Sequence, residues 1–112
     1  MNVTEETNVT ADAEVTLVTM RFTTSDPARS SAALARYVVL TRSHPGCVNV
    51  DLCTSATDPS VLVVLQKWDS ATSQRAHFDS DDMVRMASDL SGLLTAAPSI
   101  ELLDPISAHD LR

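Results

Sequence analysis

The amino-acid sequence predicts one α+β domain of the ferredoxin-like type, in which the order βαββαβ builds a four-stranded antiparallel sheet with helices on one face. Length and composition fit a single globular domain, because the chain has 112 residues, of which 44% are hydrophobic and 21% are charged. Apolar residues recur with the period of a strand or of a helix, in the order strand, helix, strand, strand, helix, strand. We therefore expect the domain over residues 15–106, between flexible polar tails over 1–14 and 107–112.

The first strand and the first helix have clear sequence signals. Residues 15–23, VTLVTMRFT, are rich in β-branched side chains and alternate between two faces, which predicts a strand. Asp26 followed by Pro27 is typical of a helix N-cap and first helical position, and the apolar spacing that follows predicts a helix of about 16 residues. Pro45 and Gly46 end this helix, because proline disfavours helical backbone in the residue before it and glycine permits a left-handed turn.

Two further strands follow, and the residues between them predict a hairpin. Alternation over residues 47–53 places Val48, Val50 and Leu52 on one face of the first of these strands. Residues 61–68, VLVVLQKW, form a continuous apolar run of the length that a buried strand takes. The link between the two strands is rich in Ser, Thr, Asp and Pro, which favour turns.

The second helical region is expected in two pieces. A short helix ends at Phe78 and a second piece ends before Pro98, and each is preceded by an Asp-Ser pair that suits an N-cap, at 69–70 and 79–80. Residues 99–106, SIELLDPI, predict the last strand. The side chains expected in the core of these helices are Met83, Ala87, Leu90, Leu94 and Phe78, together with Tyr37 from the first helix.

Charge and composition exclude several classes of partner. A net charge of −7 repels a phosphate backbone and an anionic membrane surface, so we expect neither nucleic-acid nor membrane binding. No apolar run reaches the roughly 18 residues of a membrane span, and the N-terminus lacks the pattern of a signal peptide, which predicts a cytoplasmic protein. His44, His77 and His109 are widely spaced and form no ligand pattern, so we expect no metal and no cofactor.

The predicted sheet has a second face that its own helices do not cover. The strands carry apolar side chains on both faces, most clearly from Val61 through Leu65, and such a surface needs a cover. A second copy of the chain is the least demanding cover, because identical sheets can pack face to face about a two-fold axis. We therefore expect a homodimer.

Three stretches of the sequence carry a resemblance to a known family. They are HPGCVNVDL at 44–52, VVLQKWDSATSQRAHFDS at 63–80 and DMVRMASDLSGLLTAAPSIELLD at 82–104. The shared features are a Gly-Cys strand opening, a Trp that ends the third strand, and Ala76-His77 at the ninth residue beyond that Trp. Over roughly residues 15–106 the chain resembles the antibiotic biosynthesis monooxygenase family. The resemblance implies a dimeric α/β barrel, and this family includes cofactor-independent oxygenases of quinols and of polycyclic anthrones.

Trp68 and His77 are the candidate catalytic residues. The Trp68 ring suits stacking on a flat substrate, and its indole N–H could donate to a developing oxyanion, although a Trp that closes a strand also suits a core or a dimer interface. A neutral His77 could act as a general base near pH 7, or serve as a capping or surface histidine. The candidate substrate-binding residues are Arg21, Asn49 and Asp51 on the strands and, from the resemblance, Arg85 on the later helix.

Three hypotheses for the function follow. The first is a cofactor-independent monooxygenase that oxidises a small aromatic quinol or an anthrone-type polycycle with O2. The second is a barrel without catalytic activity that binds a ligand or serves an accessory role, because an Asn and a Tyr that the resembled polyketide oxygenases use are absent from this chain. The third is a cofactor-free isomerase or cyclase that uses His77 as the base.

Overall fold

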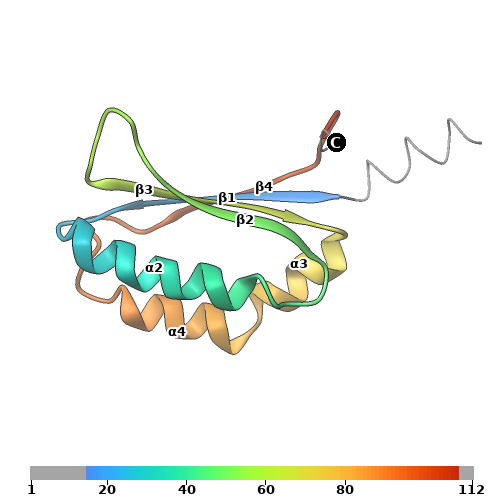
Figure 1. The fold of residues 1–112 in the computed structure, drawn as a ribbon, viewed down its shortest axis with the longest axis horizontal. Helices are drawn as coiled ribbons and strands as arrows, with labels where there is room; N and C mark the ends of the chain where they lie inside the picture. The colour runs from blue at the N-terminus through green and yellow to red at the C-terminus, as the bar shows by residue number, and fades with distance from the viewer. Residues whose placement is uncertain (1–14, 109–112) are drawn as a thin grey trace, which may run out of the picture.

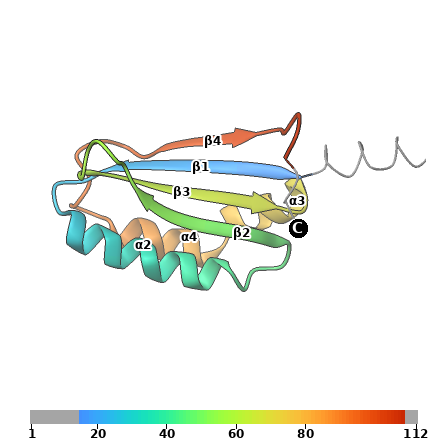
Figure 2. The ribbon, with the colours of Figure 1, turned by 45° about the horizontal axis from the view of Figure 1, so that its top comes forward.

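The computed structural model describes residues 15–108 and confirms the ferredoxin-like α+β fold. Helices α2, α3 and α4 all lie on one face of a four-stranded sheet, which Figures 1 and 2 show from two directions. The strands are antiparallel neighbours in the order β2-β3-β1-β4. The elements are β1 (Thr16–Thr23), α2 (Pro27–Thr41), β2 (Cys47–Thr54), β3 (Val61–Trp68), α3 (Ala71–Phe78), α4 (Asp81–Asp89) and β4 (Ser99–Leu103).

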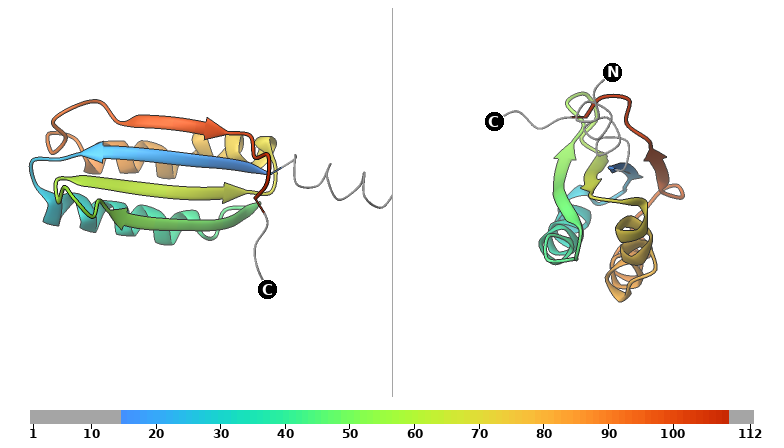
Figure 3. Two further views of the ribbon diagram at one scale, coloured as in Figure 1. Left: turned by 90° about the horizontal axis from the view of Figure 1, so that it is seen from above. Right: turned by 90° about the vertical axis from the view of Figure 1, so that its right-hand side faces the viewer.

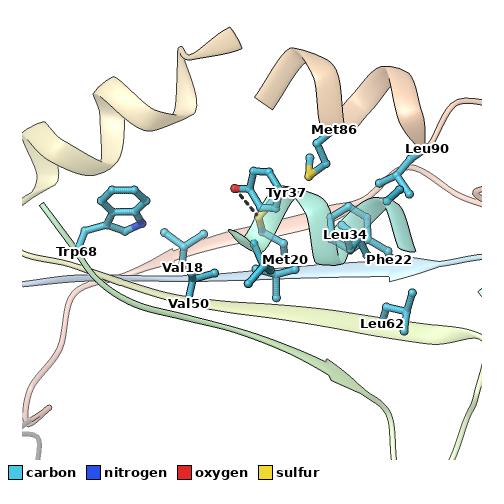
Figure 4. Close-up of a cluster of buried hydrophobic side chains, with 13 residues drawn as sticks. Val18, Met20, Phe22, Leu34, Tyr37, Val50, Leu62, Trp68, Met86 and Leu90 are labelled. Carbon is cyan, nitrogen blue, oxygen red and sulfur yellow. Dashed lines mark hydrogen bonds between the residues drawn. The ribbon is translucent and has the colours of Figure 1, made fainter. Parts of the chain in front are cut away.

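The core lies between the sheet and the helices, and strands β1 and β3 supply its floor. Strand β1 alternates as predicted, because Val18, Met20 and Phe22 are buried while Arg21 is exposed. The antiparallel register places Met20 opposite Val64 and Phe22 opposite Leu62. Figure 4 shows Met20, Phe22 and Leu62 beneath Met86 of α4 and Leu90 at the C-cap of that helix, with Trp68 at the far end of the cluster.

Strand β2 departs from the predicted alternation at its first residues. The register with β3 shifts between Cys47 and Asn49, so one extra residue, Val48, stands in β2 without a partner. Val48 is therefore 47% exposed, whereas Cys47 packs against the core. Beyond the bulge the predicted pattern returns, with Val50 buried.

The second helical region is in two pieces, as predicted, but its second piece is shorter than expected. Helix α4 ends at Asp89, and Gly92 adopts a positive φ of 80° in the turn that follows. Leu94 consequently lies outside the helix, where it forms an isolated bridge with Thr24.

Two predictions about the core are wrong. Ala87 is exposed, and Met86 takes its place in the buried seam between Met83, which packs against the core, and Leu90, which is buried as predicted. Phe78, at the end of α3, is 42% exposed. Tyr37 is buried as predicted.

The face of the sheet away from the helices is partly covered by the chain itself. After β4, which ends at Leu103 rather than at 106, the chain turns across this outer face near the ends of β1 and β3 (Figure 3). There the Lys67 ammonium donates a hydrogen bond of 2.6 Å to the carbonyl oxygen of Ala108. The tail predicted over residues 1–14, and residues 109–112 of the tail predicted at the other end, lie outside the described residues. Between residues 15 and 108 no helix is long and apolar enough to cross a bilayer.

Gly46 joins the end of α2 to the start of β2 and lies against the start of α3. Its φ is +81°, and its carbonyl oxygen accepts a 2.9 Å hydrogen bond from the backbone N–H of Asp69. A Cβ atom at this position would overlap the Ser73 side chain and lie 2.6 Å from Oδ1 of Asp69. Both the backbone conformation and the close approach therefore require glycine.

We predict that Gly46→Ala lowers the free energy of unfolding by about 3 kcal/mol, from a left-handed backbone and from displacement of the first turn of α3. Gly92→Ala is the matched control, since Gly92 has a φ of +80° but nothing within 4 Å of the added Cβ. It should cost only about 1 kcal/mol. Urea unfolding of both variants measures the difference, and equal losses would show that the close approach at Gly46 is unimportant.

Candidate active site

Trp68, Gln66, Tyr37 and His77 form a buried polar cluster between the sheet and the helices. Trp68 and Gln66 come from the inward-facing positions of β3, Tyr37 comes from α2, and His77 comes from α3. All four side chains are at most 5% exposed. The Trp68 and His77 rings stack, with centroids 4.8 Å apart and planes 27° apart. The two residues predicted to be catalytic are therefore in contact.

The hydrogen bonds within this cluster have a fixed direction. The indole N–H of Trp68 can only donate, and it donates to Oε1 of Gln66 at 2.9 Å. The Gln66 amide is thereby oriented with Nε2 toward Tyr37, and it donates to the phenol oxygen at 2.7 Å. The indole N–H is thus already paired.

The last member of the cluster is His77, whose Nε2 lies 2.7 Å from the Tyr37 oxygen. The Tyr37 hydroxyl has one hydrogen, and its other acceptors are the sulfurs of Met83 at 3.3 Å and Met20 at 3.8 Å. An imidazole nitrogen is nearer and a stronger acceptor than a thioether, so we assign the hydroxyl hydrogen to Nε2 of His77.

This assignment places the single hydrogen of the neutral His77 ring on Nδ1. Nδ1 is buried and has no hydrogen-bond partner among the described residues, and the same holds for Oγ of the nearby Ser80. A buried N–H without an acceptor is rare and costs about 1–3 kcal/mol. The cluster therefore offers one unused donor, which a ligand oxygen could accept.

A second histidine lies beside this cluster. His44, in the turn after α2, contacts the His77 ring edge to face, with centroids 4.4 Å apart and planes at 90°. Nε2 of His44 lies 2.7 Å from Oδ2 of Asp82 in α4. The side chains of His44 and Asp82 are 21% and 22% exposed, so this pair connects the buried cluster to the surface.

Burial shifts the pKa values of both titratable groups inside the cluster. Desolvation, reinforced by the nearby His44 and opposed by Asp82, lowers the pKa of His77 to about 4. Desolvation raises the pKa of Tyr37 to about 12, although the hydrogen bond from Gln66 opposes it. Both side chains are therefore neutral at physiological pH, and His77 is a weak proton acceptor.

A crevice lies beside Tyr37, along the seam between α2 and α4. This narrow crevice of about 10 Å³, room for about one water molecule, is lined by Tyr37, Asp82 and Arg85 among others. An open groove of about 270 Å³ lies farther along the same seam. The ion pair between Arg36 and Asp89, with an N–O distance of 2.9 Å, contributes to the walls of both.

Three of the four predicted substrate-binding residues lie on the face of the sheet away from Trp68 and His77. Arg21 is exposed on the outer face of the sheet. Asn49 and Asp51 lie on the same outer face of β2, where the Asn49 amide donates to the Asp51 carboxylate at 2.9 Å. Arg85 is on the helix side and lines the crevice. The structure thus brings Arg85 near the cluster and leaves the other three on the opposite face.

Sequence reasoning missed Gln66, His44 and Asp82, and it assigned Tyr37 only to the core. Gln66 carried a signal, because it is a polar residue at an inward position of an otherwise apolar strand. The pairing of His44 with Asp82 joins residues 38 positions apart, and no local pattern predicts it. Between residues 15 and 108, no group of three or more His, Cys, Asp or Glu side chains is placed to hold a metal ion.

The fold and the cluster define a small α+β protein whose candidate site is a group of buried aromatic and polar side chains between an antiparallel sheet and the helices on one of its faces. The sequence profile of the family described as "Antibiotic biosynthesis monooxygenase" matches residues 16–88, and the chain belongs to this family. A monooxygenase-like role is thereby supported at the level of the family. No match was found among curated proteins.

Solved structures share the fold over most of their length. Rv0793 from Mycobacterium tuberculosis is 26% identical with a TM-score of 0.77, and the alignment covers 86% of this chain and 99% of that one. SnoaB, a cofactor-independent oxygenase from Streptomyces nogalater, is 21% identical with a TM-score of 0.74, covering 88% and 97%. A putative antibiotic biosynthesis monooxygenase from Caulobacter crescentus is 20% identical with a TM-score of 0.75, covering 91% and 99%.

The lowered pKa of His77 predicts a specific acid sensitivity. In the unfolded chain His77 has a pKa of about 6.5, whereas in the folded chain it binds a proton only near pH 4. His77 therefore contributes stability above about pH 6.5 that is lost as the pH falls toward 4, by about 3 kcal/mol in all. Urea unfolding at several pH values in this window measures it. The variant His77→Gln should lose less stability on acidification than the wild type, and equal acid sensitivity would contradict a neutral, buried His77.

Proposed function

We propose that the protein is a cofactor-independent monooxygenase that oxidises a small aromatic quinol or an anthrone-type polycycle with O2. The observation that carries the proposal is the N–H assigned to His77, which is buried beside the Trp68 ring and finds no acceptor among residues 15–108. A substrate hydroxyl or keto oxygen supplies that acceptor. Family membership supports the reaction class.

This oxygenation requires no cofactor, because the substrate itself supplies the electrons to O2. An electron-rich aromatic anion passes an electron to O2 directly, one oxygen atom of O2 enters the substrate and the other leaves as water. For an anthrone, the CH2 group becomes C=O with release of one water molecule. The protein binds the ring, excludes bulk water and stabilises the substrate anion, and a neutral N–H donor aimed at the oxyanion serves the last task.

In this proposal each part of the cluster has a stated role. His77 donates from Nδ1 to the substrate oxygen. Trp68 backs the His77 ring, and Gln66 and Tyr37 hold the imidazole in the tautomer that places the hydrogen on Nδ1. An aromatic ring is far larger than the crevice, so its entry requires α4 to move away from α2 at the Arg85 end of the seam.

The test of the oxygenase is O2 uptake by chelator-treated protein with a panel of hydroquinones and anthrones. We expect uptake by the wild type and a loss of about 100-fold to 1,000-fold in His77→Ala, because one donor to the oxyanion is removed. Arg75→Ala, on the exposed side of the same helix, is the control and should keep the wild-type rate. A wild type that consumes no O2 across the panel would refute the proposal.

A second candidate function is a ligand-binding or accessory role without turnover. The closed packing around Trp68, which is fully buried, favours it. The third hypothesis, proton transfer in an isomerase or cyclase, would keep the cluster and need no O2. Turnover under strictly anaerobic conditions would identify that function.

We also propose a homodimer formed through the outer face of the sheet. Leu17 and Val63 are half-buried on this face, and Leu65 and Leu103 are 42% and 37% exposed. These side chains form an apolar surface opposite the helices. In a dimer, Arg21, Asn49 and Asp51 would lie in or beside the interface rather than in the substrate site.

We predict that Leu65→Glu dissociates the dimer, because it buries a charge in the apolar centre of the interface. Sedimentation at micromolar concentration should give a dimer for the wild type and a monomer for this variant. Val84→Glu is the matched control, since Val84 is 69% exposed on the helix side, and it should remain dimeric. A wild-type monomer would refute the interface.

A further inference from the structure

We propose that His44, held by Asp82, is the general base that removes the hydroxyl proton of the substrate. The inference rests on the proposed function only in taking the substrate to be a hydroxylated aromatic. It deepens that function by separating two tasks, because His77 donates to the substrate oxygen and His44 accepts the proton.

The contact with Asp82 determines which nitrogen of His44 is basic. A carboxylate can only accept, so the hydrogen of a neutral His44 ring lies on Nε2, 2.7 Å from Oδ2 of Asp82. The lone pair is left on Nδ1. When Nδ1 takes up a proton, the new imidazolium is stabilised by the adjacent carboxylate.

The other side chains of the cluster are less suited to accept a proton. Nε2 of His77 already accepts from Tyr37, and its Nδ1 carries the hydrogen, so this ring has no free lone pair. The Tyr37 oxygen accepts from Gln66 and is neutral. His44 is therefore the basic nitrogen that this arrangement leaves available.

His44 is also within reach of a ligand bound at His77. The two rings are in edge-to-face contact with centroids 4.4 Å apart, so a ligand that reaches His77 is close to His44. The crevice between α2 and α4 is lined by Tyr37 of the cluster and by Asp82 of the His44–Asp82 pair.

The groups that the structure places against the His44 side chain come from two helices. They are Asp82 from α4 and His77 from α3, while the backbone N–H of Cys47 donates to the His44 carbonyl oxygen. Of these groups, the Asp82 carboxylate makes the direct hydrogen bond to the imidazole, at 2.7 Å.

The step is balanced as a proton transfer. The O–H bond of the substrate breaks, its electron pair stays on the oxygen as the anion that His77 stabilises, and the proton bonds to Nδ1 of His44. Because the His44–Asp82 pair is about one-fifth exposed, the proton then passes to solvent and the base is restored.

The test uses para-nitrophenol, whose anion is yellow and whose neutral form is colourless, and which O2 does not oxidise. We expect the wild-type protein to raise the ratio of bound anion to bound neutral phenol above that in water at the same pH. His44→Ala should lower this ratio about tenfold, and Asp82→Asn should lower it in the same direction while keeping the imidazole ring. Asp79→Asn, an exposed carboxylate paired with Arg75, is the control and should match the wild type.

Added imidazole should restore the anion in His44→Ala, which a purely structural role for His44 would not produce. Three results would overturn the proposal: a wild type that leaves the bound phenol neutral, an unchanged ratio in Asp82→Asn, or no rescue by imidazole in His44→Ala. If the wild type ionises the phenol through His44 yet consumes no O2 with any quinol, the base assignment stands and the oxygenase fails. If it consumes O2 at the same rate and with the same pH profile after His44→Ala, the oxygenase stands and the base assignment fails.

Discussion

The need to pair polar groups inside an apolar core is the constraint on which the site depends. Trp68, Gln66 and Tyr37 satisfy one another in a chain of donors that leads to His77. Each bond orients the next, so the position of the indole at the end of β3 fixes the tautomer of an imidazole on α3. The chain of donors ends at Nδ1 of His77, for whose hydrogen the described residues offer no acceptor. This unsatisfied donor distinguishes the candidate site from a purely structural network.

Local pattern predicted most of the fold, because strand alternation and helix caps depend on near neighbours. β1 has the alternation expected of it, β3 has the expected ends, and Asp26 caps α2 by accepting from the backbone N–H of Arg29. The errors arise where one residue changes the phase. Val48 bulges out of β2, and α4 stops before the turn at Gly92, so the alternation or periodicity read from the sequence no longer applies. Such shifts are set by packing against other elements.

The site was less predictable than the fold for the same reason. Trp68 and His77 are separated by one turn and one short helix, so their contact follows from nearby structure. Tyr37 reaches the cluster from α2, His44 from the turn after α2, and Asp82 from α4. Arg21, Asn49 and Asp51 suit a pocket by residue type, but the alternation of their strands points them away from the helices.

The chain has a single tryptophan and a single tyrosine, and both belong to the cluster. The fluorescence and circular dichroism of tryptophan and tyrosine therefore originate in the one region where a ligand is expected. Occupancy, helix displacement and ring ionisation can be followed there without attaching a dye, because no tryptophan or tyrosine elsewhere in the chain contributes to these signals.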